Sequence, residues 1–82
     1  MKRLVINPEG WPCTLAECPP GHFLFGEYLC FKTEYAQEVK GDYFPQSYCE
    51  TGEFFWGGTK THEERSRLIV QPVTAEWEEY EE

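Results

Sequence analysis

The chain has 82 residues, with 7 Lys and Arg against 15 Asp and Glu, so its formal net charge is −8 at pH 7. This length allows one domain with one core and excludes a two-lobed enzyme with a cleft between the lobes. No stretch approaches roughly eighteen consecutive apolar residues, so no membrane-spanning helix is expected. The apolar run at 4–6 is too short for a signal peptide. These observations predict a cytoplasmic protein that does not insert in a membrane.

The negative charge is concentrated at the C-terminus. Five of the fifteen acids lie in the last seven residues, and the other ten outnumber the seven basic residues by three. Binding of a nucleic acid through its phosphates needs a basic face, so direct nucleic-acid binding is not expected. An acidic surface suits a basic protein partner, or it simply keeps a small protein soluble. The sequence leaves both interpretations open.

Aromatic residues dominate the apolar content. Phe, Trp and Tyr number fourteen, whereas Leu, Ile and Val together number eleven. A few aromatic side chains can build a small core because each buries roughly 150–250 Å². A domain of this size cannot hide all fourteen, so we expect the rest to line a binding surface or a contact in a homo-oligomer.

The N-terminal part of the chain predicts a strand followed by a structured loop. The segment 2–6 is rich in strand-forming residues and ends at a turn signal, Asn7-Pro8. The segment 7–21 then holds four prolines and two glycines. Its rigid turns present Trp11 either as a contact surface or as a lid over the core.

A β-hairpin is expected next. The segments 22–25 and 28–31 flank Gly26-Glu27, and glycine at the first central position is typical of a type II′ turn. The implied register pairs Phe25 with Tyr28, Leu24 with Leu29, Phe23 with Cys30, and His22 with Phe31. Both faces of this hairpin are apolar, which predicts central strands in a sheet or a face that meets another subunit.

The second half of the chain predicts further short elements. These are a polar segment over 32–42 that ends in a turn or loop tip at 40–42, an edge strand over 43–50 that contains Pro45, a short strand over 53–56, a capped helix over 62–67 and a last strand over 68–73. The helix follows from Thr61 and Glu64, which match a capping box. The fold class predicted is therefore β-rich (α+β at most): a small, mainly antiparallel curled sheet or barrel of five to six short strands with one short helix.

The C-terminal segment differs in composition from the rest of the chain. We expect a single β-rich domain over 1–74 and an acidic, aromatic-containing tail over 75–82. Trp77 and Tyr80 lie three residues apart and would share one face of a helical turn that docks on its own body or on a neighbouring chain.

The four cysteines allow two interpretations. In a reducing compartment a stable disulfide is not expected, and a four-cysteine set is commonly used for zinc. The candidate ligands are Cys13, Cys18, Cys30 and Cys49, with His22 as a conceivable addition to the first pair. Structural zinc sites bring ligands in close pairs, which only Cys13 and Cys18 approximate. The alternative is that all four are free thiols that behave as small hydrophobic residues, with no cofactor bound.

A second candidate site lies around the Gly-Gly turn. Gly57-Gly58 leads to a capped helix, and such a terminus can bind an anion. Basic side chains flank it (Lys60, Arg65 and Arg67), and aromatic side chains precede it (Phe54, Phe55 and Trp56). A nucleotide could stack its base on an aromatic ring and place its phosphates at the cap. Alternatively, the glycines only permit positive φ and the aromatic residues belong to the core.

Three segments resemble small uncharacterised proteins encoded in tailed-phage genomes and prophages: PCTLAECPPGHFLF, GEFFWGGT and ERSRLIVQPV. The likeness spans roughly residues 7–73. The resemblance implies an accessory factor acting in a bacterial host cell, of the kind that antagonises bacterial immunity by blocking a defence protein or by sequestering its nucleotide signal. It carries no mapped site residue.

These observations favour a non-enzymatic binding protein that inhibits a host defence factor through an acidic and aromatic surface. The expected contact residues are Trp11, Phe54, Phe55, Trp56, Gly57, Gly58, Lys60, Arg65, Trp77 and Tyr80. Two alternatives stay open: sequestration of a nucleotide-like small molecule at 54–60, and a structural or virion-associated module held together by zinc. No carboxylate pair, triad or cofactor fingerprint favours an enzyme.

Overall fold

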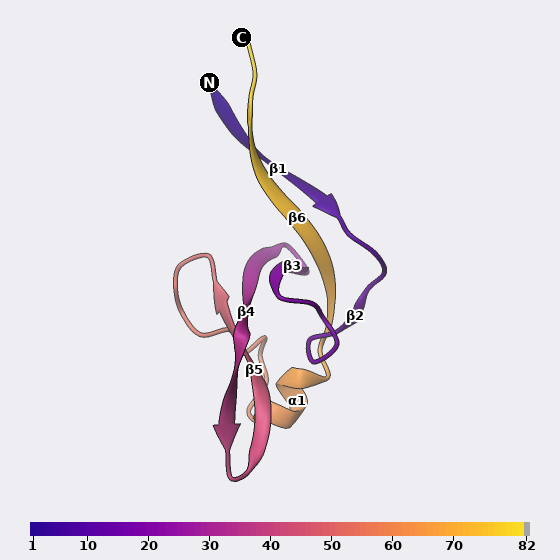
Figure 1. Ribbon diagram of the computed structural model, residues 1–82, viewed down its shortest axis with the longest axis vertical. Coiled ribbons are helices and arrows are strands. Elements are labelled where there is room, and N and C mark those ends of the chain that lie inside the picture. The colour runs from indigo at the N-terminus through magenta and orange to yellow at the C-terminus, as the bar shows by residue number, and fades with distance from the viewer. Residues whose placement is uncertain (82) are drawn as a thin grey trace.

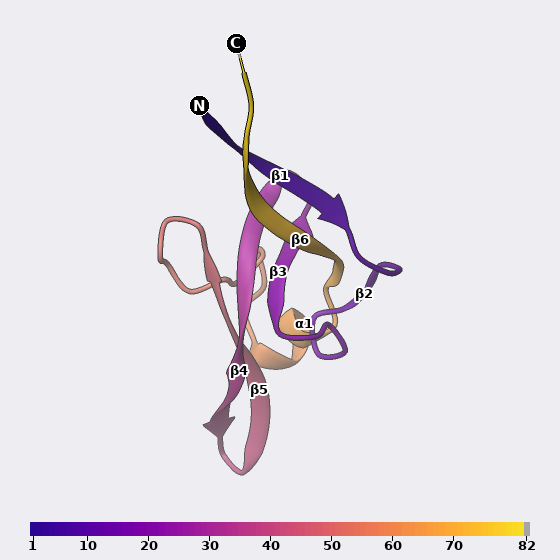
Figure 2. The same ribbon diagram turned by 45° about the horizontal axis from the view of Figure 1, so that its top comes forward.

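The computed structural model describes residues 1–81 and contains one antiparallel sheet with a single short helix (Figures 1 and 2). The elements in chain order are β1 (Lys2–Pro8), β2 (Cys13–Thr14), β3 (Gly21–Phe25), β4 (Tyr28–Val39), β5 (Asp42–Cys49), α1 (His62–Ser66) and β6 (Ile69–Glu79). The strand order is β1-β6-β3-β4-β5, with β2 also paired to β6. The sheet is open because β1 and β5 are its two edges. The predicted β-rich fold is confirmed, as a curled open sheet rather than a barrel.

The core lies around β3, where this strand pairs with β4 and β6. Its buried residues are Leu15, Cys18, Phe23, Cys30, Phe55 and Val70. Phe55 meets Phe23 and Phe25 edge-on, with ring centroids 5.3 and 5.4 Å apart. Aromatic pairs therefore hold the centre, as expected from the scarcity of aliphatic residues.

The buried Lys32 side chain fastens the loop before β3 to this core. Its ammonium donates hydrogen bonds to the carbonyls of Leu15, Ala16 and Cys18. Three backbone acceptors that would otherwise lack partners are thus satisfied by a single charged donor, which offsets the cost of burying the charge. These hydrogen bonds help to hold the proline-rich loop in place.

The central hairpin has the predicted register. β3 pairs with β4 so that Phe23 faces Cys30 and Phe25 faces Tyr28. Gly26 has φ of 61°, which the first central position of a type II′ turn requires. β3 is a central strand of the sheet, because β6 pairs with its other edge.

The polar segment 32–42, to which no strand was assigned, is mostly strand, and the turn expected at its end is confirmed. β4 continues to Val39 and pairs with β5 beyond a bulge that lies between Lys32 and Ala36. Lys40 and Gly41 both have positive φ, 51° and 86°, so they form a hairpin turn whose twist matches the flanking strands. The residues are polar because this part of the ladder extends past the core toward solvent. The predicted edge strand containing Pro45 is confirmed as β5.

The predicted helical turn at Trp77 and Tyr80 is also wrong. β6 continues to Glu79 and pairs with β1 from Pro8–Val73 to Lys2–Glu79. The expected boundary at 74/75 lies within this strand, and Glu82 lies outside the described residues. In an extended strand the alternating acids face solvent while Ala75 and Trp77 share the other face with β1 side chains. The two termini lie side by side at one end of the molecule (Figure 1).

The predicted capped helix is confirmed. The Thr61 side chain accepts a hydrogen bond from the N–H of Glu64 at 3.1 Å, and α1 spans His62–Ser66. Figure 1 places α1 beside β5 at the lower half of the molecule. With five residues, α1 is far too short to cross a membrane, and it is the one helix in residues 1–81.

Candidate functional site: an aromatic cluster around a buried arginine

Five ring-bearing side chains meet where the β4/β5 hairpin approaches α1. His62 is the hub, with its ring 4.8 Å from that of Trp56 and stacked on that of Phe44 at 5.3 Å. Phe54 contacts both His62 and Trp56, and Tyr48 meets Phe54 edge-on. We call this set the aromatic cluster: Phe44, Tyr48, Phe54, Trp56 and His62. Three separate segments supply it, so the tertiary fold creates it.

Sequence and local structure place each segment of the cluster. The Thr61 cap starts α1 and puts His62 on its first turn, facing β5. Tyr48 forms an isolated bridge with Phe54, which directs the segment 54–56 back across β5. The predicted strand at 53–56 is therefore a single bridge in the structure.

Arg65 lies beneath this cluster and is fully buried. Its guanidinium carbon lies 4.7 Å from the centre of the Phe54 ring and 5.7 Å from the Trp56 ring. Its Nη2 lies 3.1 Å from Nδ1 of His62, so His62 accepts this bond as a neutral imidazole. Its Nε and Nη1 have no hydrogen-bond partner among residues 1–81. Burial lowers the pKa of Arg65, yet a guanidinium stays charged at neutral pH.

No carboxylate compensates this charge within residues 1–81. The salt bridge found in that part of the chain joins Arg3 to Glu78 on the surface, at 3.3 Å. A buried cation with no counter-ion costs several kcal/mol, and a desolvated contact with an aromatic face recovers about 2 kcal/mol or more of that cost. The site therefore holds a positive charge that an anionic group would stabilise.

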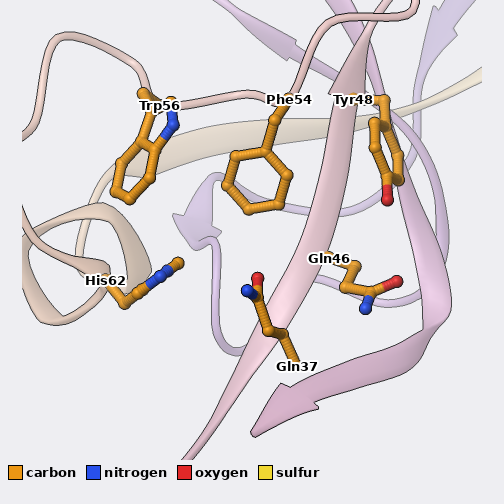
Figure 3. Close-up of a pocket in the computed structure, with 6 residues that line it drawn as sticks. All are labelled: Gln37, Gln46, Tyr48, Phe54, Trp56 and His62. Atoms are coloured by element: carbon orange, nitrogen blue, oxygen red, sulfur yellow. The ribbon is translucent and has the colours of Figure 1, made fainter. Parts of the chain in front are cut away.

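Two cavities adjoin the cluster and share Trp56 and His62 as walls. The first has a volume of about 290 Å³ and is lined by Gln37, Gln46, Tyr48, Phe54, Trp56 and His62. Figure 3 shows the rings of Phe54 and Trp56 on one side of this space, with His62 and Gln37 facing them. The second, about 310 Å³, includes the side chains of Lys40, Asp42, Lys60 and Glu63. The first cavity thus offers ring faces and amide groups, and the second offers two ammonium groups beside two carboxylates.

The N–H groups at the helix cap predicted to bind phosphate already donate hydrogen bonds to side chains of the same segment. The Thr61 hydroxyl accepts from the N–H of Glu64, and the Glu64 carboxylate accepts from the N–H of Lys60 at 3.5 Å. The first turn also carries Glu63 and Glu64, whose charges oppose an incoming anion. A phosphate would therefore sit near the Lys40 and Lys60 side chains rather than at the cap.

The predicted contact residues separate into three places. Trp56 and Phe54 belong to the aromatic cluster, and Arg65 lies beneath it. Lys60 lines the second cavity. Phe55 is instead a core residue, 3% exposed, and the glycines shape the turn. The φ of Gly57 is 62°, and a Cβ there would overlap the Leu68 side chain.

The other predicted contact residues lie far from the cluster in the fold. Trp11 is 88% exposed on the loop after β1, and Trp77 is 70% exposed on β6. The N–H of Tyr80 donates to the Met1 carbonyl, and its ring faces Arg3 at 5.4 Å. Trp77 and Tyr80 belong to the β1/β6 end of the molecule, and Trp11 lies on the loop between β1 and β2.

The four cysteines are free thiols and fall into two pairs. Cys30 and Cys49 are opposite partners on β4 and β5, whereas Cys13 and Cys18 flank the turn that Lys32 fastens. Across residues 1–81, no group of three or more His, Cys, Asp or Glu side chains is placed to hold a metal ion. Nor does this arrangement bring His22 to the first pair as a third ligand.

Sequence reasoning missed Gln37, Gln46, Phe44, Tyr48 and His62 as site residues. Four of them lie on the β4/β5 hairpin, part of which was not predicted as strand. A signal was present: Lys40-Gly41 lies between the alternating segments 34–39 and 42–46 and has the form of a two-residue hairpin turn. No protein-family model, curated protein or solved structure matches the chain. The site therefore rests on its own geometry.

Proposed function

We propose that this chain is a non-enzymatic binding protein whose ligand is a nucleotide-type small molecule held at the aromatic cluster. The observation that carries this proposal is Arg65, which is fully buried among aromatic rings with two guanidinium nitrogens unpartnered. An anionic group would offset its uncompensated charge. A planar group would stack on the exposed ring faces, and nucleotides combine both features.

The two cavities support a definite orientation of such a ligand. A base would enter the first cavity against Phe54 and Trp56, where the side-chain amides of Gln37 and Gln46 can donate to and accept from its edge. The phosphate would extend into the second cavity toward Lys40 and Lys60. Neutral His62 would lie between them and offer its Nε2–H as a donor.

We propose that the site sequesters its ligand. Nucleotide sequestration in a bacterial cell is one of the two ways in which the resembled phage proteins would disarm a host defence factor. That biological role stays a prediction from the sequence, as does assembly into a homo-oligomer.

Tryptophan fluorescence provides the test. The double variant Trp11→Phe/Trp77→Phe removes two indoles that lie away from the cluster and leaves Trp56 as the reporter. We expect nucleoside 5′-monophosphates to quench Trp56, because a base stacked on the indole changes its environment. The matching nucleosides should bind more weakly, and inorganic phosphate alone should not change the emission.

The matched variant is Arg65→Met, which removes the buried charge and keeps a similar length of apolar side chain. It should weaken binding of the monophosphates measurably, because it removes a positive charge that lies behind Phe54 and Trp56, although the Arg65 side chain lines neither cavity. Equal affinity of Arg65→Met and the parent protein would contradict the proposed role of the site. So would the absence of quenching by any of the four common ribonucleoside monophosphates.

A second candidate function is the binding of a protein partner, and a different observation favours it. On β1 and β6 the register places Leu4 beside Trp77 and Ile6 beside Ala75 on one face. Leu4, Ile6 and Trp77 are 39%, 37% and 70% exposed, and β1 is an edge strand. We call this surface the ribbon face. An apolar face beside an unpaired strand edge suits a partner that adds a strand of its own.

The charges around the ribbon face indicate a basic partner. Glu76, Glu78, Glu79 and Glu81 lie along this end of the molecule, opposed by Lys2 and Arg3. Capture of a basic host protein that is lost with Trp77→Ala, kept with Trp56→Ala and weakened by salt would favour this function over nucleotide binding. Capture that depends on Trp56 and not on Trp77 would exclude the ribbon face.

A further inference from the structure

Two of the cysteines face each other across the β4/β5 ladder. Cys30 and Cys49 are directly opposite partners. The N–H of Cys49 donates to the carbonyl of Glu53 at 2.7 Å, and its carbonyl accepts from the N–H of Gly52 at 2.9 Å. Because neither backbone group of Cys49 bonds to Cys30, this is a non-hydrogen-bonded pair, in which the Cα atoms lie about 4.5 Å apart. That separation is within the range of about 4.4–6.8 Å that disulfides span.

The surroundings give the two thiols different access. Cys30 is 2% exposed and belongs to the core, whereas Cys49 is partly exposed, and both line a small surface cavity with Tyr48 and Glu50. Burial, and then the neighbouring Cys49, raise the pKa of Cys30 to about 12. Cys30 therefore keeps its proton at neutral pH, and Cys49 is the thiol that an oxidant reaches first.

We propose that Cys30 and Cys49 form a redox-active pair whose disulfide fastens the end of β5 to β4. Cys49 is the last residue of β5, and the chain turns after it to carry Phe54 and Trp56 into the aromatic cluster. The disulfide would fix the position of Cys49, the residue after which that segment begins. This inference does not depend on which ligand, if any, binds at the cluster.

The reaction needs a disulfide-type oxidant, for which glutathione disulfide serves. The Cys49 thiolate attacks one sulfur of glutathione disulfide, which forms a mixed disulfide and releases one glutathione thiolate. Cys30 then gives up its proton, and its sulfur attacks the Cys49 sulfur and displaces the second glutathione. Two protein thiols are oxidised, one glutathione disulfide is reduced to two thiols, and the protein loses two hydrogens.

Alkylation mapping of the whole chain tests the proposal. Reduced protein is equilibrated with a series of oxidised and reduced glutathione mixtures, quenched in acid, unfolded, alkylated with iodoacetamide and digested. We expect the peptides of Cys30 and Cys49 to become linked and unalkylated, with a loss of about 2 Da. The melting temperature should rise by more than about 5 °C, because the link closes a loop of roughly twenty residues.

Two single variants distinguish the Cys30/Cys49 pair from the Cys13/Cys18 pair. Cys49→Ser should lose both the linked peptide and the rise in melting temperature, whereas Cys13→Ser should keep both. Cys30 and Cys49 alkylated in every glutathione mixture would overturn the proposal, and so would a link from Cys30 to Cys18 instead. The peptide map of the parent protein decides the matter even where a variant folds poorly.

Discussion

The sheet extends beyond its core in two directions, and the two extensions are built differently (Figures 1 and 2). The β4/β5 extension is braced from the side, because Phe44 stacks on His62 of α1. The β1/β6 extension has no such brace among the described residues, since β1 pairs with β6 alone and leaves Leu4 and Trp77 exposed. An isolated two-stranded ribbon is marginally stable in water.

This difference bears on what each end can bind. Side chains on the braced end are held by packing before a ligand arrives, so little conformational entropy is lost when a small molecule binds. The ribbon end offers an open strand edge and an apolar face of low local stability, which suits a partner that completes the sheet. We therefore assign small-molecule binding to the aromatic cluster and keep protein binding for the ribbon face.

The largest expected effect belongs to the core that joins the two extensions. Phe23→Ala should cost about 3–5 kcal/mol of unfolding free energy, because the side chain is fully buried against Phe55. Urea unfolding followed by circular dichroism measures this cost. The control is Trp11→Ala, where an 88% exposed side chain should change stability by about 0.5 kcal/mol or less. Comparable losses in the two variants would mean that the core lies elsewhere.

Alkaline pH should destabilise the reduced protein next most strongly. Burial raises the pKa of Cys18 to about 11 and that of Cys30 to about 12, from an ordinary value of 9.0. Between pH 9 and 11 the unfolded chain releases these protons while the folded chain keeps them, so stability falls with pH, by roughly 1–3 kcal/mol. Burial lowers the pKa of Lys32, so the contribution of this group to stability rises with pH instead.

Comparison with Cys18→Ala/Cys30→Ala isolates the contribution of the two thiols. Urea unfolding of both proteins at pH 8, 9, 10 and 11, with a thiol reductant present, gives the two slopes. A slope unchanged by the double substitution would show that other groups cause the alkaline loss.

Removal of residues 75–82 should have an intermediate effect. It takes away the partner of β1 over 2–6 and leaves the core residue Val70 and its neighbours in place. We expect a folded body that is less stable by about 0.5–3 kcal/mol, with hydrogen exchange becoming fast in 2–8 and unchanged in β3 and β4. Loss of protection in β3 would show that the ribbon is part of the cooperative core.

Arg65→Met should change stability little or raise it slightly. Replacing an uncompensated buried charge with an apolar side chain is often neutral or stabilising. Thermal unfolding checks this expectation, with Arg67→Met on the exposed side of α1 as the control. A fall of more than about 3 kcal/mol would indicate that Arg65 is a structural residue, satisfied by its contacts with His62, Phe54 and Trp56.

The smallest expected effect is that of Trp77→Ala on stability. This side chain is 70% exposed on an unbraced strand, so the unfolding free energy should change by about 0.5 kcal/mol or less. Capture of a protein partner would nevertheless be lost if the ribbon face is its docking surface. Retained capture would show that Trp77 is not part of the docking surface.

Much of the fold could be predicted because local signals and the final structure agree. Gly26 needs positive φ, Thr61 and Glu64 form a cap, and Pro45 keeps its strand at an edge. Two of the differences, at 32–39 and 75–79, have a common cause. Both segments are polar ladders outside the core, where strand pairing rather than hydrophobic alternation decides the structure.

The site was predictable in part for a related reason. Phe54 and Trp56 precede the Gly-Gly turn and Arg65 follows the helix cap, so this local pattern indicated them. Phe44 and Gln37 join them through the β4/β5 pairing, for which Lys40-Gly41 is a local signal, and through the packing of α1, which no local pattern encodes. Whether Phe55 or Phe54 faces the core was likewise decided by the single bridge between Tyr48 and Phe54.

The central claim is that the aromatic cluster, and not the ribbon face, takes the small-molecule ligand. A ¹H–¹⁵N correlation spectrum recorded during titration with the four ribonucleoside 5′-monophosphates tests it, because the three indole N–H signals report on three separate places. We predict that the Trp56 indole and the side-chain amides of Gln37 and Gln46 shift, while the indoles of Trp11 and Trp77 do not. Shifts confined to Trp77, or no shift at Trp56 with any of the four nucleotides, would contradict the claim.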